Sequence, residues 1–318
     1  MRVVFMGTPE IAVPPLEKIL LQSYEVCAVF TQPDRPSGRG HARKPGPVKT
    51  FALEKGLTVF QPERIRDEAS VRIMEEIGPD FIVVAAYGQI LPKPVLRSAK
   101  LVPLNIHFSL LPSYRGAAPV AKAILNGDTF TGVTIMVMEE SLDSGPVLRQ
   151  RTLAIPPSAT TGEIEAKLSV AGGEILVETM DAYLRRDVTP FDQDEEKASW
   201  APRITKEDAR IDWNENAFKI HNRVRAMNPK PGAFTFWGDQ MLHIWGSRPE
   251  PGQNRESAVP GTFLGMAEHC LRIQCAEETV LQISELQKPS KNRVSGREFA
   301  NGARLCEGIR IFKNSRSL

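Results

Sequence analysis

The sequence of 318 residues has few cysteines and no long apolar run. Its four cysteines, Cys27, Cys270, Cys275 and Cys306, are too few and too scattered for a disulfide framework, and no second pair completes a zinc site with Cys270 and Cys275. We therefore expect reduced thiols and no metal. No apolar run reaches the roughly twenty residues of a membrane helix, and no basic start leads into an apolar leader segment. These absences predict a soluble protein that is not secreted.

A marked excess of one charge sign is also missing, because 40 Lys and Arg stand against 38 Asp and Glu. With 42% apolar residues, this is globular composition, which excludes disordered, collagen-like and coiled-coil chains, and the length suggests two domains. The charges nearly balance over the whole chain, but the net charge differs between its two parts. Residues 206–318 hold 17 cationic and 13 acidic residues, a net charge of +4, whereas residues 1–205 hold 23 and 25, a net charge of −2. A basic second part fits a polyanionic partner, and chance explains it equally well.

The first part of the chain alternates between strand-like and helix-like segments. Strands are expected at Arg2–Met6, Glu25–Phe30, Leu57–Phe60, Asp80–Ala86, Pro103–His107 and Gly132–Met138, and helices at Pro9–Gln22, Val48–Lys55, Ile65–Ile77 and Thr160–Arg185. The run Asp80–Ala86 is apolar on both faces, as in the central strand of a covered parallel sheet. The pattern predicts a doubly wound α/β domain that binds its ligands beyond the carboxyl ends of the strands.

The second part has a different pattern. Residues 190–205 are rich in charge and read as a linker between a domain of residues 1–189 and one of residues 206–318. After a helix near Ala217–Met227, short strands are expected at Ala233–Trp237, Met241–Ser247, Gly261–Met266, Leu271–Cys275 and Thr279–Ile283. Short strands separated by glycine and proline indicate a small barrel of the OB type.

Two glycine-containing segments follow the first strands. The first strand ends in Gly7-Thr-Pro-Glu10 without the G-x-G-x-x-G fingerprint, so a tight turn explains Gly7 better than a dinucleotide site. Thr31–Pro47 contains four prolines, three glycines and the cations Arg35, Arg39, Arg43 and Lys44. We expect a basic loop over the carboxyl-end crevice, with a merely solvated loop as the alternative.

Asn105 and His107 are the strongest candidates for chemistry. They are two residues apart at the end of a predicted strand, so their side chains share one face. An amide and an imidazole there can polarise a carbonyl oxygen, and the imidazole can move a proton near neutral pH. Asp143 follows the strand Gly132–Met138 and is either a turn former or the group that supports the imidazole. On the residues alone, a structural role for His107 is equally good.

The chain resembles the folate-dependent formyltransferases in Asn105-x-His107, Ser109-Leu-Leu-Pro112, Gly116-Ala-Ala-Pro119 and Leu142-Asp143-Ser-Gly145. It is similar to the bacterial members that act on methionyl-tRNA in Thr31-Gln-Pro-Asp-Arg-Pro36, Gly38-Arg-Gly40 and Ala209-Arg-Ile-Asp-Trp213. The resemblance extends almost from end to end, with the motifs in order. It departs from the family pattern at Phe108, where we expect a small residue, and at Ser113, where an arginine is frequent. Phe108 would alter the rim of the pocket, and Ser113 would remove a cationic contact to the substrate.

The resemblance implies a Rossmann-like N-terminal domain and an OB-like C-terminal domain. It implies transfer of a formyl group from 10-formyltetrahydrofolate, a co-substrate and not a tightly bound cofactor, to the α-amino group of methionyl initiator tRNA. Asn105 and protonated His107 would stabilise the oxyanion, supported by Asp143. Ser109, Leu110, Leu111 and Pro112 would line the folate pocket, and Arg39, Arg43 and Lys44 would contact the tRNA. The enzyme would be a cytoplasmic monomer without a membrane partner.

Two alternatives remain at this point. The same Asn-His-Asp set would serve a formyltetrahydrofolate hydrolase or a formyltransferase that acts on a small amine. Such enzymes have no use for a basic second domain. A non-enzymatic RNA-binding protein with a degenerate Rossmann domain is the other alternative, and it predicts loss of some of the three polar residues. All three are present in this sequence.

Overall fold

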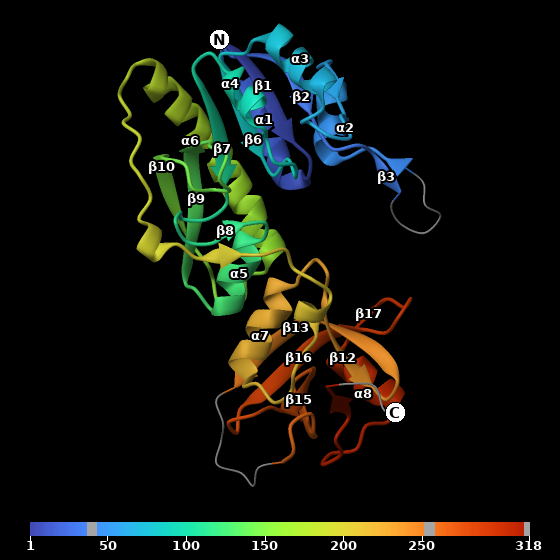
Figure 1. Ribbon diagram of the computed structural model, residues 1–318. Coiled ribbons are helices and arrows are strands. Elements are labelled where there is room, and N and C mark those ends of the chain that lie inside the picture. Colours follow the sequence, from blue (N-terminus) through green and yellow to red (C-terminus); the bar gives the residue numbers. More distant parts are fainter. Residues whose placement is uncertain (37–42, 251–257, 315–318) are drawn as a thin grey trace. The chain divides into compact units, whose positions relative to one another are not determined.

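The computed structural model describes residues 1–36, 43–250 and 258–314 (Figure 1). The chain divides into two compact units. The first unit consists of Met1–Pro119, Phe130–Ala154 and Glu165–Ala201, and the second of Val120–Thr129, Ile155–Ile164 and Pro202–Leu318. Among the described residues, no helix has both the length and the apolar content needed to cross a membrane.

A seven-stranded sheet with the order β10-β9-β7-β6-β1-β2-β5 forms the centre of the first unit. Its strands are β1 (Arg2–Gly7), β2 (Glu25–Phe30), β5 (Val59–Phe60), β6 (Phe81–Ala85), β7 (Val102–His107), β9 (Phe130–Val137) and β10 (Val147–Ala154). Neighbours from β5 to β7 are parallel, whereas β9 and β10 are antiparallel additions. The predicted α/β class with a mostly parallel sheet is therefore confirmed.

The strand order reverses at β1. The chain proceeds from β1 to β2 and β5 on one side, and then crosses to β6 and β7 on the other side. In open α/β sheets, a crevice forms at the carboxyl ends of the strands beside such a reversal, and ligands bind there. β6 and β7 therefore deliver the residues that follow Ala85 and His107 to the edge where a site is expected.

Helices cover both faces of this sheet. They are α1 (Val13–Leu20), which follows the 3-10 turn η1 (Glu10–Ala12), α2 (Pro47–Glu54), α3 (Glu68–Ile77), α4 (Lys93–Arg97) and α6 (Thr161–Leu184), whereas α5 (Pro119–Asn126) belongs to the second unit from Val120 onward. Met74 of α3 and Val95 of α4 pack in one buried cluster with Met6 and Val84 of the strands. Gly172 of α6 lies against β7 and β9 on the opposite face. Val84 is paired in register with Asn105, so Asn105 and His107 lie on the face that α3 and α4 cover.

Two short strand pairs complete the first unit. β3 (Arg35–Pro36) pairs antiparallel with β4 (Arg43–Lys44) at the base of the predicted basic loop. β8 (Arg115–Gly116) pairs in parallel with β11 (Trp200–Ala201), which follows the 3-10 turn η2 (Glu195–Lys197). Residues up to Ala201 of the segment expected as a linker thus belong to the first unit, and the second unit resumes at Pro202.

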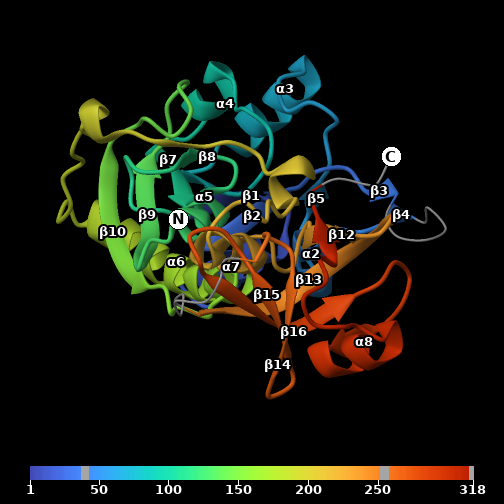
Figure 2. The same cartoon turned by 90° about the horizontal axis from the view of Figure 1, so that it is seen from below.

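The second unit is an antiparallel β domain (Figure 2). Its elements are η3 (Glu207–Ala209), α7 (Ala217–Ala226), β12 (Ala233–Trp237), β13 (Gln240–Glu250), β14 (Phe263–Ala267), β15 (Cys270–Gln274), β16 (Val280–Gln287), β17 (Arg293–Ser295), α8 (Gly296–Ala303) and β18 (Phe312–Lys313). The strand order is β14-β15-β16-β13-β12-β18. Thr262, just before β14, forms an isolated antiparallel bridge with Arg310, which lies shortly before β18. Backbone bonds between Phe263 of β14 and both Ile309 and Gly308 lie beside this bridge, so the chain near the two ends of the sheet is linked by hydrogen bonds, as in a barrel.

The ten strands and helices predicted in the first part, and the helix and five strands predicted in the second, are all present. β2 and β12 have the predicted bounds, and the ends of the others are shifted. The longer elements that were not predicted are β10, α4, α5 and α8, and the short strands β3, β4, β8, β11, β17 and β18 and the 3-10 turns η1, η2 and η3 were also missed. β10 carries Arg149, Gln150 and Arg151 in a row, which hides its alternation. α4 has only five residues and begins with Lys-Pro. α8 had a usable signal, because Ser295 and Glu298 form a capping box.

Candidate active site

Asn105 and His107 lie at the carboxyl end of β7, as their spacing predicts. They are 9% and 5% exposed. Burial of an amide and an imidazole is costly unless polar partners replace water. Two loops that follow other strands provide those partners.

Asp143 lies in the loop between β9 and β10, residues 138–146, which we call the Asp143 loop. One of its carboxylate oxygens, Oδ2, is 3.6 Å from Nδ1 of His107 and accepts the backbone N–H of Gly116 at 2.8 Å. The other, Oδ1, is 3.5 Å from Nδ2 of Asn105. The structure therefore brings the three predicted catalytic side chains together across 38 residues of sequence.

The second ring nitrogen of His107 also faces an acceptor. Nε2 lies 2.9 Å from the carbonyl oxygen of Tyr114. A carboxylate on one side and a carbonyl on the other offer no hydrogen-bond donor to the ring, so the imidazolium, which has two N–H groups, matches both neighbours. Each ring nitrogen of His107 therefore has an oxygen acceptor near it.

A cavity of about 490 Å³ opens beside these groups. Its lining comes from four segments, 84–91, 105–108, 116–119 and 136–143. The walls are largely apolar, and Asn105, His107 and Asp143 form the polar end. This volume and this mixture are typical of a site for a small organic molecule.

Three residues at or beside this cavity have a strained backbone. Ala86, Tyr114 and Asp143 adopt positive φ angles of 47°, 61° and 52°, which residues with a side chain rarely do. Ala86 and Asp143 line the cavity, and the carbonyl of Tyr114 contacts His107. Such strain persists only where the surroundings hold it, and it is frequent at functional sites.

One buried hydroxyl in the cavity wall has no partner. Tyr87 is 1% exposed, and its Oη makes no hydrogen bond to any described residue. Burial raises the pKa of Tyr87 to about 12, so the hydroxyl stays protonated in the neutral range. The Oη atom itself has almost no accessible surface, and the ring packs in the apolar cluster with Met6 and Val84.

The predicted folate residues lie beside the cavity and do not line it. The Ser109 hydroxyl donates to the carbonyl of Ser113 at 2.6 Å, and Thr134 donates to the carbonyl of Ser109. Leu111 is buried in a small cluster with Met136 and Val147. Leu110 and Pro112 are partly buried in the same turn. Phe108, where the family pattern has a small residue, does line the cavity.

The predicted tRNA residues can be placed only in part. Arg39 lies outside the described residues. Arg43 pairs with Pro36 through the backbone of β4, and Lys44 next to it is exposed. The base of this loop is held by Asp34, which accepts bonds from Lys49 and Gln61. Neither Arg43 nor Lys44 lines the cavity at the end of β7.

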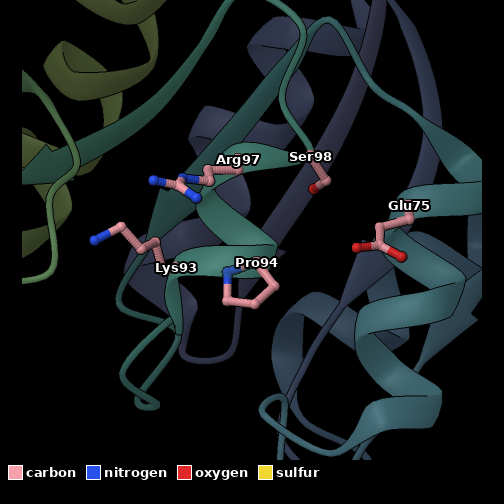
Figure 3. A pocket seen from close by; sticks show the side chains of 5 residues that line it. All are labelled: Glu75, Lys93, Pro94, Arg97 and Ser98. Carbon is pink, nitrogen blue, oxygen red and sulfur yellow. The ribbon is translucent and has the colours of Figure 1, made fainter.

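A second hollow of the first unit lies between α3 and α4 (Figure 3). Its volume is about 340 Å³, and its lining is Glu75, Lys93, Pro94, Arg97 and Ser98. Glu75, Lys93 and Arg97 are exposed, and none of the three catalytic candidates reaches it. Exposed charges without a convergent buried group do not make a catalytic site, so we place the chemistry at the end of β7.

Comparison with known proteins shows the family of the chain. Residues 1–180 match the family model described as formyl transferase, and residues 203–304 match the model of the formyl transferase C-terminal domain. The chain is 43% identical to the methionyl-tRNA formyltransferase of Enterococcus faecalis over 95% of this chain and 96% of that one. It is 41% identical to the methionyl-tRNA formyltransferase of Bacillus subtilis over 96% of each chain.

Solved structures extend the likeness to the fold. HypX from Aquifex aeolicus, crystallised in complex with tetrahydrofolic acid, superposes with a TM-score of 0.61 at 19% identity, over 94% of this chain and 47% of that chain. At this identity the likeness concerns the fold alone. The two family models and the nearly full-length relatives decide the family: this chain belongs to the formyltransferases, and the relatives named above are methionyl-tRNA formyltransferases.

Proposed function

We propose that this protein transfers the formyl group of 10-formyltetrahydrofolate to the α-amino group of methionyl initiator tRNA. The observation that carries the proposal is the convergence of Asn105, His107 and Asp143 at the polar end of an apolar cavity. Relatives that cover nearly the whole chain bear this activity in their names. A folate is bound in a protein of the same fold.

The reaction needs groups that stabilise charge and move one proton. The amine attacks the formyl carbon, and the resulting tetrahedral oxyanion collapses with cleavage of the bond between that carbon and N10 of the folate. Over the reaction the amine loses a proton and N10 gains one. Asn105 donates from Nδ2 to the oxyanion, and a protonated His107 is its second donor.

His107 requires one change of partner to fill this role. Its Nε2 lies 2.9 Å from the carbonyl of Tyr114, so its N–H must be shared with the formyl oxygen when substrate is bound. The carboxylate of Asp143 stays 3.6 Å from Nδ1 and offsets the positive charge of the ring. Asp143 also accepts a proton that the amine gives up, directly or through water.

We assign the cavity to the folate. A flat heteroaromatic ring fits apolar walls such as those of Phe108, Met136 and Met138. Ser109–Pro112, predicted to bind folate directly, would instead support the cavity through Thr134 unless the turn moves. Their direct contact with folate stays a prediction.

The second unit and the basic loop are assigned to the tRNA. The net charge of +4 over residues 206–318 supports phosphate contacts, which dominate affinity for nucleic acids. Arg39, Arg43 and Lys44 belong by sequence to the loop whose base Asp34 and Gln61 hold in place. Binding of the tRNA by these residues stays a prediction.

The deciding experiment is formylation of charged initiator tRNA with 10-formyltetrahydrofolate as donor. We expect formylmethionyl-tRNA and tetrahydrofolate in equal amounts. Two parallel reactions, one with an amino sugar nucleotide as acceptor and one with water alone, test the small-amine transferase and the hydrolase. Transfer to the sugar, or release of formate at the same rate without tRNA, would reject the proposed acceptor.

A further inference from the structure

Gln193 connects the Asp143 loop to Arg115. Its Nε2 donates to the backbone carbonyls of Asp143 and Gly145, at 2.8 Å each. Its Oε1 accepts from Nε and Nη2 of Arg115, at 3.1 and 2.9 Å. Both N–H groups and both lone pairs of the amide are therefore used, which leaves the side chain a single orientation.

The Asp143 loop depends on such a support. Its residues 139–142 are exposed, so solvent surrounds half of it. Asp143 itself has a positive φ of 52°, a conformation that persists only when neighbouring groups hold it. Gly145 is pressed against β9 so closely that a Cβ would overlap the carbonyl of Val137. Gln193 holds the two backbone carbonyls between which the loop turns back to β10.

Arg115 in turn is held by Glu195. Its guanidinium is 3% exposed and donates from Nη1 and Nη2 to the two carboxylate oxygens of Glu195, at 2.9 and 2.7 Å. The hydrogen bonds with Glu195 raise the pKa of Arg115 and lower that of Glu195, so both stay charged. A fork with two parallel bonds fixes the plane of the guanidinium and hence the position of Gln193.

The neighbours of Arg115 in the chain contact the catalytic candidates. The carbonyl of Tyr114 faces His107, and the N–H of Gly116 binds the carboxylate of Asp143. The side chain of Ser199 accepts the N–H of Tyr114 at 2.9 Å, and its carbonyl accepts that of Arg115 at 2.8 Å. The segment from Gln193 to Ala201 therefore backs both loops.

None of Arg115, Gln193 and Glu195 lines the cavity, so they cannot act on a substrate directly. We propose that Gln193, oriented by Arg115 and Glu195, is a positioning residue that sets the distance between the carboxylate of Asp143 and the imidazole of His107. This inference rests on the proposed function, because it assumes that Asp143 and His107 do the chemistry. It assigns a role to a segment that the sequence suggested to be a linker.

The test is the replacement Gln193→Met, which keeps the length of the side chain and removes all four hydrogen bonds. A displacement of about 1 Å at a catalytic group costs up to a hundredfold in rate, so kcat should fall about ten- to a hundredfold. KM for folate and for tRNA should change less than about threefold, because no bound group is lost. A kcat within about twofold of the unchanged protein overturns the inference.

A second variant keeps the test valid if Gln193→Met folds poorly. Gln193→Glu retains the bonds to Arg115 and replaces the two donors that face Asp143 and Gly145 with acceptors. It should lose kcat to a similar degree while the thermal midpoint stays close to that of the unchanged protein. Retention of kcat in this variant would also overturn the inference, because the inference depends on the two N–H groups of Gln193 that bind the carbonyls of Asp143 and Gly145.

A double-mutant cycle separates positioning from mere structural support. In an Asp143→Asn background, Gln193→Met should lower kcat less than threefold further, because its effect passes through the carboxylate that is already gone. Losses that multiply would show that Gln193 acts elsewhere. Arg151→Met is the matched control, because Arg151 forms ion pairs with Glu174 and Glu178 in the same unit, away from the cavity. It should leave kcat unchanged.

The outcomes also distinguish this inference from the proposed function. If His107→Ala retains activity, the assignment of the site fails, whatever Gln193 does. If His107→Ala loses activity and both Gln193 variants retain it, the site stands and only the positioning role fails.

Discussion

His107 in the first unit is buried and His221 in the second is partly buried. In each residue, both ring nitrogens have an oxygen atom nearby. His107 lies between the carboxylate of Asp143 and the carbonyl of Tyr114. His221 lies between the hydroxyl of Ser247 and the carbonyl of Pro157, each at 3.0 Å. Burial lowers the pKa of His221 and so favours its neutral ring. The hydroxyl of Ser247 can donate to that neutral ring, whereas the carboxylate beside His107 can only accept.

Arg115 in the first unit and Lys288 in the second are held in different ways. Arg115 is bound by the carboxylate of Glu195, which offsets its charge. Lys288 lies 4.6 Å from the ring centre of Trp237 and 5.3 Å from that of Phe299. A ring holds a cation in place without cancelling its charge. We therefore predict that Lys288 contacts phosphate groups of the tRNA.

The largest expected effect concerns the donors at the end of β7. His107→Ala and Asn105→Ala should each lower kcat about a hundredfold or more, because each removes a donor to the oxyanion. The measurement is single-turnover formylation of methionyl-tRNA, with thermal unfolding as a check of the fold. His221→Gln is the control in the other unit and should retain kcat. Activity within a few-fold of the unchanged protein in either β7 variant contradicts the assignment.

Asp143→Asn tests whether the carboxylate makes His107 different from His221. With its oxygen in the place of Oδ2, the amide can still accept the N–H of Gly116 and face Nδ1 of His107, but it carries no negative charge to offset a positive ring. Its NH₂ group then lies where Oδ1 was, opposite the NH₂ group of Asn105, so two donors face each other. We expect kcat to fall on the order of tenfold to a hundredfold, with little change in either KM. Rates should be compared across pH 6 to 9. A normal rate would leave Asp143 as a turn former only.

A smaller effect is expected from the cation over the rings of the second unit. Lys288→Ala should raise KM for tRNA several-fold. In a plot of the logarithm of KM for tRNA against the logarithm of the salt concentration, the slope should fall by about one. Folate KM and kcat should not change. Lys55→Ala is the matched control, because Lys55 lies over the ring of Phe51 in the first unit at 5.4 Å. Equal effects of the two variants on tRNA binding would break the comparison between the units.

The smallest effect concerns the stability of the second unit at mildly acidic pH. The folded protein holds the pKa of His221 below its ordinary value of 6.5, so the unfolded chain binds more protons as the pH falls through that value. The free energy of unfolding contributed by His221 is therefore present above pH 6.5 and decreases below it. His221→Gln should flatten this decrease, measured by urea unfolding between pH 5 and 7.5. An unchanged pH slope would show that His221 is not the responsible group.

Much of the fold follows from local patterns. The apolar run at β6 and the alternation of β7 are properties of neighbouring residues, and both strands lie where they were predicted. β10 was missed because its Arg149 and Arg151 pair with glutamates of α6, which no local pattern reveals. Residues 190–205 read as a linker because they are charged and contain few apolar residues. In the structure, Glu195 of this segment instead forms an ion pair with the buried Arg115.

The sequence by itself determined that Asn105 and His107 share one face at the end of a strand, because successive side chains of a strand alternate between its faces. It also determined the family through the order of its motifs. Only the tertiary structure decided which groups complete the site. Asp143 reaches Asn105 across 38 residues, and Gln193 reaches Asp143 across 50. Contacts over such separations arise when strands and loops pack against one another, and neither periodicity nor propensity, both of which act over a few residues, encodes them.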